Sequence, residues 1–349
     1  MTADPVRIGV LGCADIARRR VVPAFAADPG SRVVAFASRA PANARALAER
    51  YGCRAAPGYQ ALLDDPEVEA VYVPLPVALH AEWIERALLA GKHVLGEKPL
   101  SCSPETTEAL FALAEMRGLV LAENFMFPFH HQHARVRELV ASGAIGEPRS
   151  FTGEFTIPPP APGNIRYRRE LGGGALFDIA VHPLLAAVLQ LGPGLTVRGA
   201  ALHRHPAHGV DDGGSVLLAT PEGVTAQIVF GMDHGYRSAY ELCGSEGRLL
   251  VPRAYAPPAD HRPVLRIERA TGVEELPLDA DDQYLGAVSA FSRAVHRART
   301  HHPADDQAGR RDLSLTLARL VAHVPAVDEA ASSASGEPAD TRNDPKEVL

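Results

Sequence analysis

Residues 6–17 read VRIGVLGCADIA, and this stretch decides the fold. The apolar run up to Gly12 predicts a short buried strand, and residues 14–27 predict a helix directly after it. Gly12 permits the tight turn between the two, and Ala17 is small enough for close packing of helix on strand. Such a strand-turn-helix unit is either an ordinary βα connection or a dinucleotide site. For the site, the free N–H groups at the helix start would meet a pyrophosphate through Gly12, Cys13, Ala14, Asp15 and Ile16.

The remainder of the chain divides into two regions with different patterns of predicted secondary structure. Short apolar runs alternate with helical stretches up to residue 125, which predicts βαβ units in a doubly wound parallel sheet over residues 1–125, with a further helix up to about residue 145. Strand-like segments between residues 195 and 268 have few helices between them and predict a mostly antiparallel sheet in a second α/β domain, residues 146–330. Residues 331–349 are rich in Ser, Pro, Asp and Glu, and predict a disordered tail.

Composition narrows the class of protein. A length of 349 residues suits two domains, and 35 basic against 42 acidic residues give a net charge of −7. No basic patch stands out, so we expect neither nucleic acid nor a membrane surface as a partner. The four cysteines form no CxxC pair, which favours free thiols in a reducing cytoplasm and no metal site. We expect no export signal and no membrane span.

The end of the second predicted strand indicates which nucleotide is preferred. The strand over residues 33–37 is followed by Ser38 and Arg39, and no acidic residue lies between Arg39 and Glu49. An NAD site places a carboxylate here to accept hydrogen bonds from the ribose, whereas a hydroxyl and a guanidinium suit the 2′-phosphate of NADP. The alternative is a solvated arginine on a surface loop. We therefore expect NADP(H).

Two further segments carry residues suited to acid-base chemistry. Only three of the 35 basic residues are lysine, and Lys98 follows a short apolar strand, which places it at the carboxyl edge of the sheet. Lysine can release its proton when desolvated, whereas arginine cannot. Lys92, in a polar turn, is expected to be solvated. Asp178 and His182 lie four residues apart on an apolar helix, so they share a face, either as a structural pair or as an acid-base dyad.

An ordered set of motifs resembles the Gfo/Idh/MocA oxidoreductases over about residues 6–330. The set comprises GCADIA (12–17), Ser38-Arg39, PLP (74–76) with His80, GEKP (96–99), ENFMF (123–127) with Gln132-His133, GGGALFD (172–178) and GSEGRL (244–249). Within this family, GCADIA, ENFMF and the PPP loop before Ile165-Arg166-Tyr167 are most similar to the sugar-nucleotide 3-ketoreductases of deoxysugar pathways.

The resemblance implies a Rossmann domain and an α/β domain whose open-faced sheet joins copies into a homodimer or homotetramer. It implies an enzyme of cytoplasmic antibiotic biosynthesis that uses NADPH to reduce the C3 ketone of a dTDP-linked keto-deoxysugar. The cofactor contacts carried over are Gly12, Cys13, Ala14, Asp15, Ile16, Ser38, Arg39, Leu75, Pro76, His80, Glu97, Lys98 and Asn124. The substrate contacts carried over are Phe125, Arg166, Asp178 and His182.

The expected catalytic residues are Lys98, Asp178 and His182. Lys98 and His182 would hydrogen-bond the developing alkoxide, and one of them would deliver the proton, while Asp178 orients the histidine or a sugar hydroxyl. Many sugar 3-ketoreductases have tyrosine where this chain has His182. Two alternatives share the cofactor residues: an NADP-dependent sugar or cyclic diol dehydrogenase, and a non-catalytic NADPH-sensing regulator. Retention of both Lys98 and His182 argues against the regulator.

Overall fold

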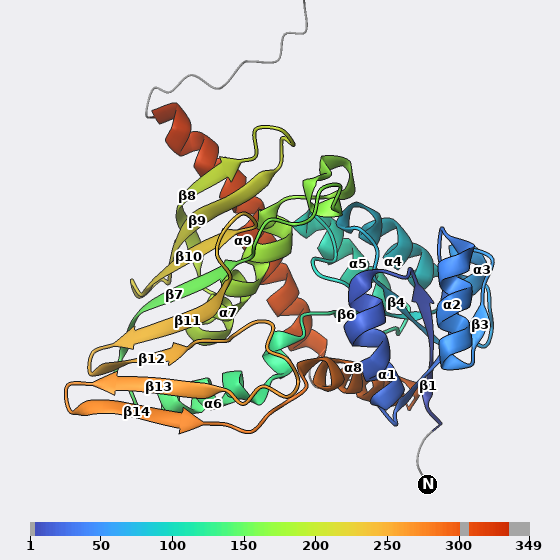
Figure 1. Ribbon diagram of the computed structural model, residues 1–349, viewed down its shortest axis with the longest axis horizontal. Helices are drawn as coiled ribbons and strands as arrows, with labels where there is room; N and C mark the ends of the chain where they lie inside the picture. The colour runs from blue at the N-terminus through green and yellow to red at the C-terminus, as the bar shows by residue number, and fades with distance from the viewer. Residues whose placement is uncertain (1–3, 301–306, 335–349) are drawn as a thin grey trace, which may run out of the picture.

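The computed structural model describes residues 4–300 and 307–334, which form two α/β halves side by side (Figure 1). The first half is built on a parallel sheet of order β3-β2-β1-β4-β5-β6. Its strands are β1 (Val6–Leu11), β2 (Ser31–Ala37), β3 (Arg54–Ala55), β4 (Ala70–Val73), β5 (His93–Gly96) and β6 (Leu121–Glu123). The connecting helices are α1 (Val22–Ala27), α2 (Pro41–Tyr51), α3 (Tyr59–Leu63), α4 (His80–Leu89) and α5 (Pro104–Met116).

This strand order confirms the predicted doubly wound sheet. The winding reverses between β1 and β4, and in such folds the crevice beyond the carboxyl ends at that point binds the ligand. β4 and β5 are buried along their whole length, which explains why they are continuous apolar runs without alternation. The sheet therefore presents the residues after β1, β2, β4 and β5 at one edge.

The second half contains a sheet of order β14-β13-β12-β11-β7-β10-β9-β8, antiparallel except for the β7–β10 pair. Its strands are β7 (Pro148–Thr156), β8 (Thr196–Arg204), β9 (Asp211–Ala219), β10 (Thr225–Gly231), β11 (Arg237–Gly244), β12 (Gly247–Val251), β13 (Val264–Arg269) and β14 (Gly272–Pro277). The mostly antiparallel sheet is confirmed. The central strand β7 was not foreseen, because it begins at a proline and alternates buried with part-exposed residues instead of forming an apolar run.

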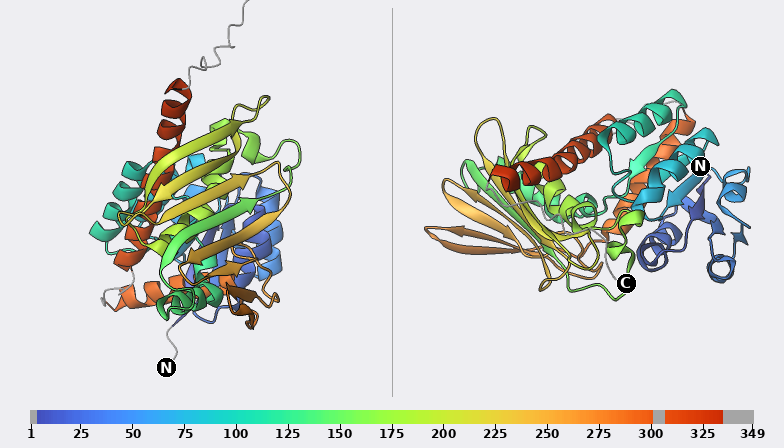
Figure 2. Two further views of the ribbon diagram at one scale, coloured as in Figure 1. Left: turned by 90° about the vertical axis from the view of Figure 1, so that its left-hand side faces the viewer. Right: turned by 90° about the horizontal axis from the view of Figure 1, so that it is seen from above.

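Helices cover one face of the second sheet and leave the other face bare (Figure 2). The covering helices are α6 (His131–Ala141), α7 (Val181–Leu191) and α9 (Gln307–Ala334). Residues Arg169–Leu191 are long and apolar enough to cross a membrane, but most of this segment is buried in the core, as in a soluble protein's central helix. Helix α9 continues to Ala334, into the predicted tail, and residues 335–349 lie outside the described residues.

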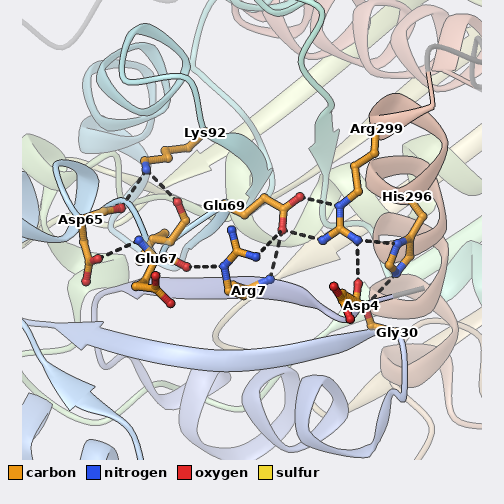
Figure 3. A network of polar contacts seen from close by, with 10 residues as sticks. Asp4, Arg7, Gly30, Asp65, Glu67, Glu69, Lys92, His296 and Arg299 are labelled. Atoms are coloured by element: carbon orange, nitrogen blue, oxygen red, sulfur yellow. Dashed lines mark hydrogen bonds and ion pairs between the residues drawn. The ribbon is translucent and has the colours of Figure 1, made fainter. Parts of the chain in front are cut away.

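Helix α8 (Gln283–Arg299) returns to the first half, although sequence analysis assigned it to the second domain. Val288, Phe291 and Val295 belong to the core of the first half. At its end, Arg299 donates Nε–H and Nη2–H to the two carboxylate oxygens of Glu69, 2.7 and 2.6 Å away (Figure 3). The two-pronged geometry makes this a strong ion pair. The end of α8 therefore closes the first half.

Lys92 differs from its expectation. It is only 8% exposed, and its Nζ donates to the carbonyl oxygens of Asp65 and Val68 at 2.9 and 2.7 Å (Figure 3). Burial lowers the pKa of this ammonium, and nearby Asp65 partly restores it. The polar turn around Lys92 gave no sign of this, because the carbonyl groups come from a segment more than twenty residues earlier.

Candidate active site

The turn that follows β1 requires glycine at residue 12. Gly12 has φ +126°, and a Cβ there would lie 3.1 Å from the Leu75 side chain and 3.3 Å from the Pro74 carbonyl oxygen. The glycine therefore lets the β1 turn approach the loop after β4. The helix that follows contains a π-helical turn, η1 (Ala17–Val21), and such turns are frequent at functional sites.

The end of β2 carries the donors expected for a 2′-phosphate. Arg39 is exposed and stands close to the Tyr59 hydroxyl: burial raises the pKa of Tyr59, and the Arg39 charge opposes that rise. Ser38 lies beside the Cys13 thiol, whose pKa burial raises and Ser38 lowers. The turns after β1 and β2 thus meet, and the donors expected to bind phosphate lie at the same sheet edge.

His80 is placed differently from a ligand contact. It is 1% exposed, and its Nδ1 and Nε2 lie 2.7 and 2.6 Å from the carbonyl oxygens of Pro99 and Leu75. Both ring nitrogens face the protein, so His80 ties the loop after β4 to the loop after β5. His80 therefore holds the loops after β4 and β5 together, which differs from the predicted contact with the cofactor.

A buried polar group supports the segment before Lys98. Glu97 is 7% exposed and accepts hydrogen bonds from the Tyr72 hydroxyl at 2.6 Å and from Asn124 Nδ2 at 2.7 Å. These contacts join β4, β5 and β6 at their carboxyl ends. A buried carboxylate with two donors stabilises the local backbone, because leaving either partner unpaired would be costly.

Lys98 meets Asp178 from the other half of the molecule. Lys98 Nζ donates to Asp178 Oδ1 at 2.7 Å and to its carbonyl oxygen at 2.8 Å. Arg166 Nε donates to the second carboxylate oxygen, Oδ2. Burial alone would raise the pKa of Asp178, but the charges of Lys98 and then Arg166 hold it well below its usual range. The three side chains form a cation-carboxylate-cation group between the two halves.

The triple glycine explains how Arg166 reaches Asp178. Gly174 has φ +123° and its N–H donates to the Arg166 carbonyl oxygen at 2.9 Å. A Cβ on Gly173 would lie 2.5 Å from the same oxygen. The glycines thus let the segment around Arg166 lie directly on the start of the Asp178 helix. Sequence analysis placed Arg166 among the substrate contacts and missed this pairing, for which the GGG run was the available signal.

His182 is enclosed by aromatic rings. It is 8% exposed, with ring centroids 4.9 Å from Phe155 and 6.0 Å from Phe125. Its Nδ1 lies 3.2 Å from the Ile179 carbonyl oxygen, so Nδ1 carries the hydrogen and Nε2 keeps a free lone pair. Burial, then the nearby Lys98 charge, lowers the pKa of His182 to about 3. His182 is therefore neutral at physiological pH.

The expected pairing of Asp178 with His182 is corrected by the structure. Over residues 4–300 and 307–334, no hydrogen bond joins the two side chains, and Asp178 instead orients Lys98 and Arg166. The reason is local: residues Leu176–Ala180 form a π-helical turn, η6, which alters the angular offset between positions four apart. Asp178 and His182 consequently have different partners, although their charges still influence each other.

One cluster outside this site has ligand atoms close enough for a metal ion among the described residues, namely His130, His131 and Asp281. Asp281 Oδ2 accepts the backbone N–H of His131 at 2.8 Å and lies 2.9 Å from its Nδ1. His130 Nδ1 accepts the Gln132 N–H and so caps helix α6. Helix capping accounts for these contacts.

Comparison with known proteins covers both halves. Residues 6–125 match the model of an oxidoreductase family with an NAD-binding Rossmann fold, and residues 133–250 match the GFO/IDH/MocA C-terminal domain. A dTDP-3,4-didehydro-2,6-dideoxy-alpha-D-glucose 3-reductase from Streptomyces violaceoruber is 57% identical over 85% of this chain and 87% of its own. The enzyme of that name from Saccharopolyspora spinosa is 51% identical over 93% of this chain and 97% of its own.

A solved structure agrees with these sequence relatives. The 3-ketoreductase from Actinomadura kijaniata, in complex with NADP and TDP-benzene, is 49% identical and superposes with a TM-score of 0.89. The match covers 93% of this chain and 98% of that one. Solved variants of the same protein replace one lysine by alanine or glutamate and one tyrosine by phenylalanine.

Proposed function

This chain belongs to the Gfo/Idh/MocA oxidoreductase family, and from that premise we propose that it is an NADPH-dependent reductase of the C3 ketone in a dTDP-linked keto-deoxysugar. The observation that carries the proposal is the Lys98–Asp178 contact, which places an oriented ammonium at the carboxyl edge of a nucleotide-binding sheet. The high identity to reductases of this name over most of their length supports the substrate class. The reaction belongs to deoxysugar biosynthesis, as found in antibiotic pathways.

The residues at the sheet edge fit NADP(H). Gly12 makes room at the β1 turn that a Cβ would fill, and Ser38 with Arg39 offers a hydroxyl and a guanidinium to a 2′-phosphate. Cys13 and Ala14 belong to the turn after β1, and Asp15 and Ile16 begin the first helix. Leu75, Pro76, Glu97 and Asn124 lie at the ends of β4, β5 and β6. When bound, the reduced nicotinamide supplies the hydride for the ketone carbon.

Lys98 is the proton donor in this proposal. As negative charge develops on the ketone oxygen, Nζ gives it a proton and the oxygen becomes a hydroxyl. Asp178 holds Nζ in one position through two contacts, which limits the orientations that the ammonium can take. His182 in its present tautomer offers only the Nε2 lone pair, so it accepts a hydrogen bond from a sugar hydroxyl rather than supplying the proton.

The solved variants of the Actinomadura protein support a pair at these positions. The lysine and the tyrosine that were changed there are separated by the same number of residues as Lys98 and His182. This spacing agrees with the expectation that a tyrosine in related reductases stands where this chain has histidine. Tyrosine carries an O–H donor, whereas neutral His182 presents an acceptor, so this chain depends more heavily on Lys98.

Arg166 and Phe125 complete the proposed substrate contacts. Arg166 uses only its Nε–H on Asp178, and its side chain is 37% exposed, so its terminal nitrogens remain available for a diphosphate oxygen. Phe125 lies edge-on to His182 and provides an apolar wall beside it.

An assay of NADPH oxidation tests the proposed function. The labile diketo sugar is generated in place from its dTDP-linked precursor by an upstream dehydratase, and we expect NADPH consumption with formation of a 4-keto sugar. Oxidation of free sugars or cyclic diols by NADP, with no turnover of the nucleotide sugar, would instead identify a dehydrogenase. Tight NADPH binding without turnover of any ketone or alcohol would indicate a sensor. Stabilisation against heat by a thymidine nucleotide separates the first outcome from the other two.

We further propose that copies associate through the bare face of the second sheet, as a homodimer or homotetramer in the cytoplasm. Leu217 and Val264 are large apolar side chains on strands of this sheet, 40% and 37% exposed, as expected for a face that awaits a partner. Light scattering coupled to size-exclusion chromatography would give the mass, and a monomer at micromolar concentration would contradict this assembly.

A further inference from the structure

A buried carboxyl group stands behind the loop that carries Lys98. Glu123 is the last residue of β6, and its Oε1 accepts the backbone N–H of Leu100 at 3.1 Å. Its other oxygen, Oε2, is buried and has no hydrogen bond of ordinary length in the described parts of the chain, although the Ser314 hydroxyl stands near the carboxyl group. A buried polar atom of this kind needs an explanation, because leaving it unpaired costs free energy.

A small cavity lies beside Glu123. Glu123 lines a space of about 10 Å³, which is about the room that one water molecule requires. Three elements meet there: Pro99 and Leu100 from the Lys98 loop, Phe177 and Val181 from the Asp178 helix, and Ser314 from α9. The cavity thus joins the nucleotide-binding edge, the catalytic helix and the long C-terminal helix.

Burial favours the neutral form of Glu123, against most of the polar groups around it. Burial raises the pKa of Glu123 to about 7; the Ser314 hydroxyl, the Leu100 N–H and the Lys98 charge oppose this rise, while Glu97 adds to it. From the other elements packed here, Thr107 of α5 contributes a hydroxyl to the cavity, and Asp178 of η6 is already engaged with Lys98. The Lys98 ammonium is therefore held mainly by Asp178 and stabilises ionised Glu123 only weakly.

We propose that Glu123 is a positioning residue for Lys98, which as a neutral acid accepts the Leu100 N–H and donates its O–H to one water in the cavity. This role rests on the proposed function of Lys98 in proton transfer. Leu100 lies two residues after Lys98, so its anchor limits movement of the loop that sets the distance between Nζ and Asp178. Ionised Glu123 would instead compete with Asp178 for the Lys98 ammonium.

The test compares Glu123→Gln with Glu123→Leu. Glutamine keeps the acceptor for Leu100 and the donor for the water but cannot ionise, whereas leucine removes both. For wild type, kcat should fall as pH rises through about 7, and Glu123→Gln should keep wild-type kcat at pH 6 within about twofold and lose that decline. Glu123→Leu should reduce kcat by about tenfold or more while NADPH affinity is unchanged, in line with the cost of a misplaced group. Glu82→Gln, an exposed carboxylate on α4, is the matched control.

Infrared spectroscopy provides a readout that does not depend on turnover. Wild type at pH 6 should display the C=O stretch of a protonated carboxylic acid that fades as pH rises through about 7, absent in Glu123→Gln and retained in Glu82→Gln. A spectrum without this band, or a pH profile of kcat that Glu123→Gln leaves unchanged, would overturn the proposal. Inactivity of the wild type on every keto sugar would contradict the proposed function alone, because the infrared band would still report the state of Glu123.

Discussion

The proposed proton transfer depends on the side chain of Lys98. Its Nζ donates to Asp178 Oδ1 and to the Asp178 carbonyl oxygen, and it can transfer its proton, which a guanidinium near neutral pH cannot. We predict that Lys98→Arg retains NADPH affinity, measured by fluorescence titration, and loses at least about a hundredfold in kcat, as expected for a lost acid. Turnover close to wild type would show that only the positive charge of Lys98 matters.

A second prediction concerns the protonation state of His182. Its low pKa, about 3, means that it contributes no titration between pH 5 and 8, where an ordinary histidine would titrate. Nitrogen-15 NMR of the ring should therefore show a neutral imidazole with the hydrogen on Nδ1 across this range. His182→Phe, which keeps a flat ring among Phe125 and Phe155, should raise KM for the sugar about three- to tenfold, the worth of one hydrogen bond. Protonation of the ring near pH 6.5 would contradict this assignment.

The end of β2 is the element that selects the cofactor. β2 ends at Ala37, so Ser38 and Arg39 leave the sheet beside the β1 turn, where the nucleotide ribose is expected. We predict that Arg39→Ala weakens NADPH binding by at least about tenfold, the loss of a charge-assisted hydrogen bond, and NADH binding by less than about twofold. Calorimetric titration with both nucleotides checks this. Equal losses for the two, or a wild-type preference for NADH, would contradict the role of Arg39.

The whole molecule should be destabilised by mild acid. Burial lowers the pKa of His130 to about 4 and of His133 and His182 to about 3, so all three are neutral when folded. The unfolded chain would protonate them below pH 6.5 and would therefore bind more protons, so the free energy of unfolding must fall as pH decreases from about 6.5 toward 4. Glu123, whose pKa is raised, acts in the opposite direction but is a single group.

We therefore predict a lower Tm at pH 5 than at pH 7, together with net proton uptake on unfolding at pH 5.5. Calorimetry in buffers of different ionisation enthalpy measures that uptake directly. A Tm that is constant between pH 5 and 7 would show that the buried histidines retain ordinary pKa values.

The sequence by itself determined whatever depends on neighbours along the chain. The strand-turn-helix unit at Gly12, the alternation of strands and helices, and the lysine at a strand end each lie within one short segment, so periodicity and turn chemistry revealed the sheet, the cofactor edge and Lys98. The spacing of Asp178 and His182 marked them as a pair, and the family resemblance added their catalytic roles and the substrate class. Strand β7 was missed, because it begins with a proline and half of its residues are partly exposed, so that it does not form an apolar run.

Only the tertiary structure decided which groups meet and which are buried. Arg166 pairs with Asp178 because three glycines bring the loop onto the helix, and a π-helical turn separates the partners of Asp178 from those of His182. Burial of Glu123 among a loop, a helix and α9 from distant parts of the chain raises its pKa to about 7. Burial and charge pairing are sums over neighbours in space, and these set the pKa values; local sequence carries no record of those neighbours.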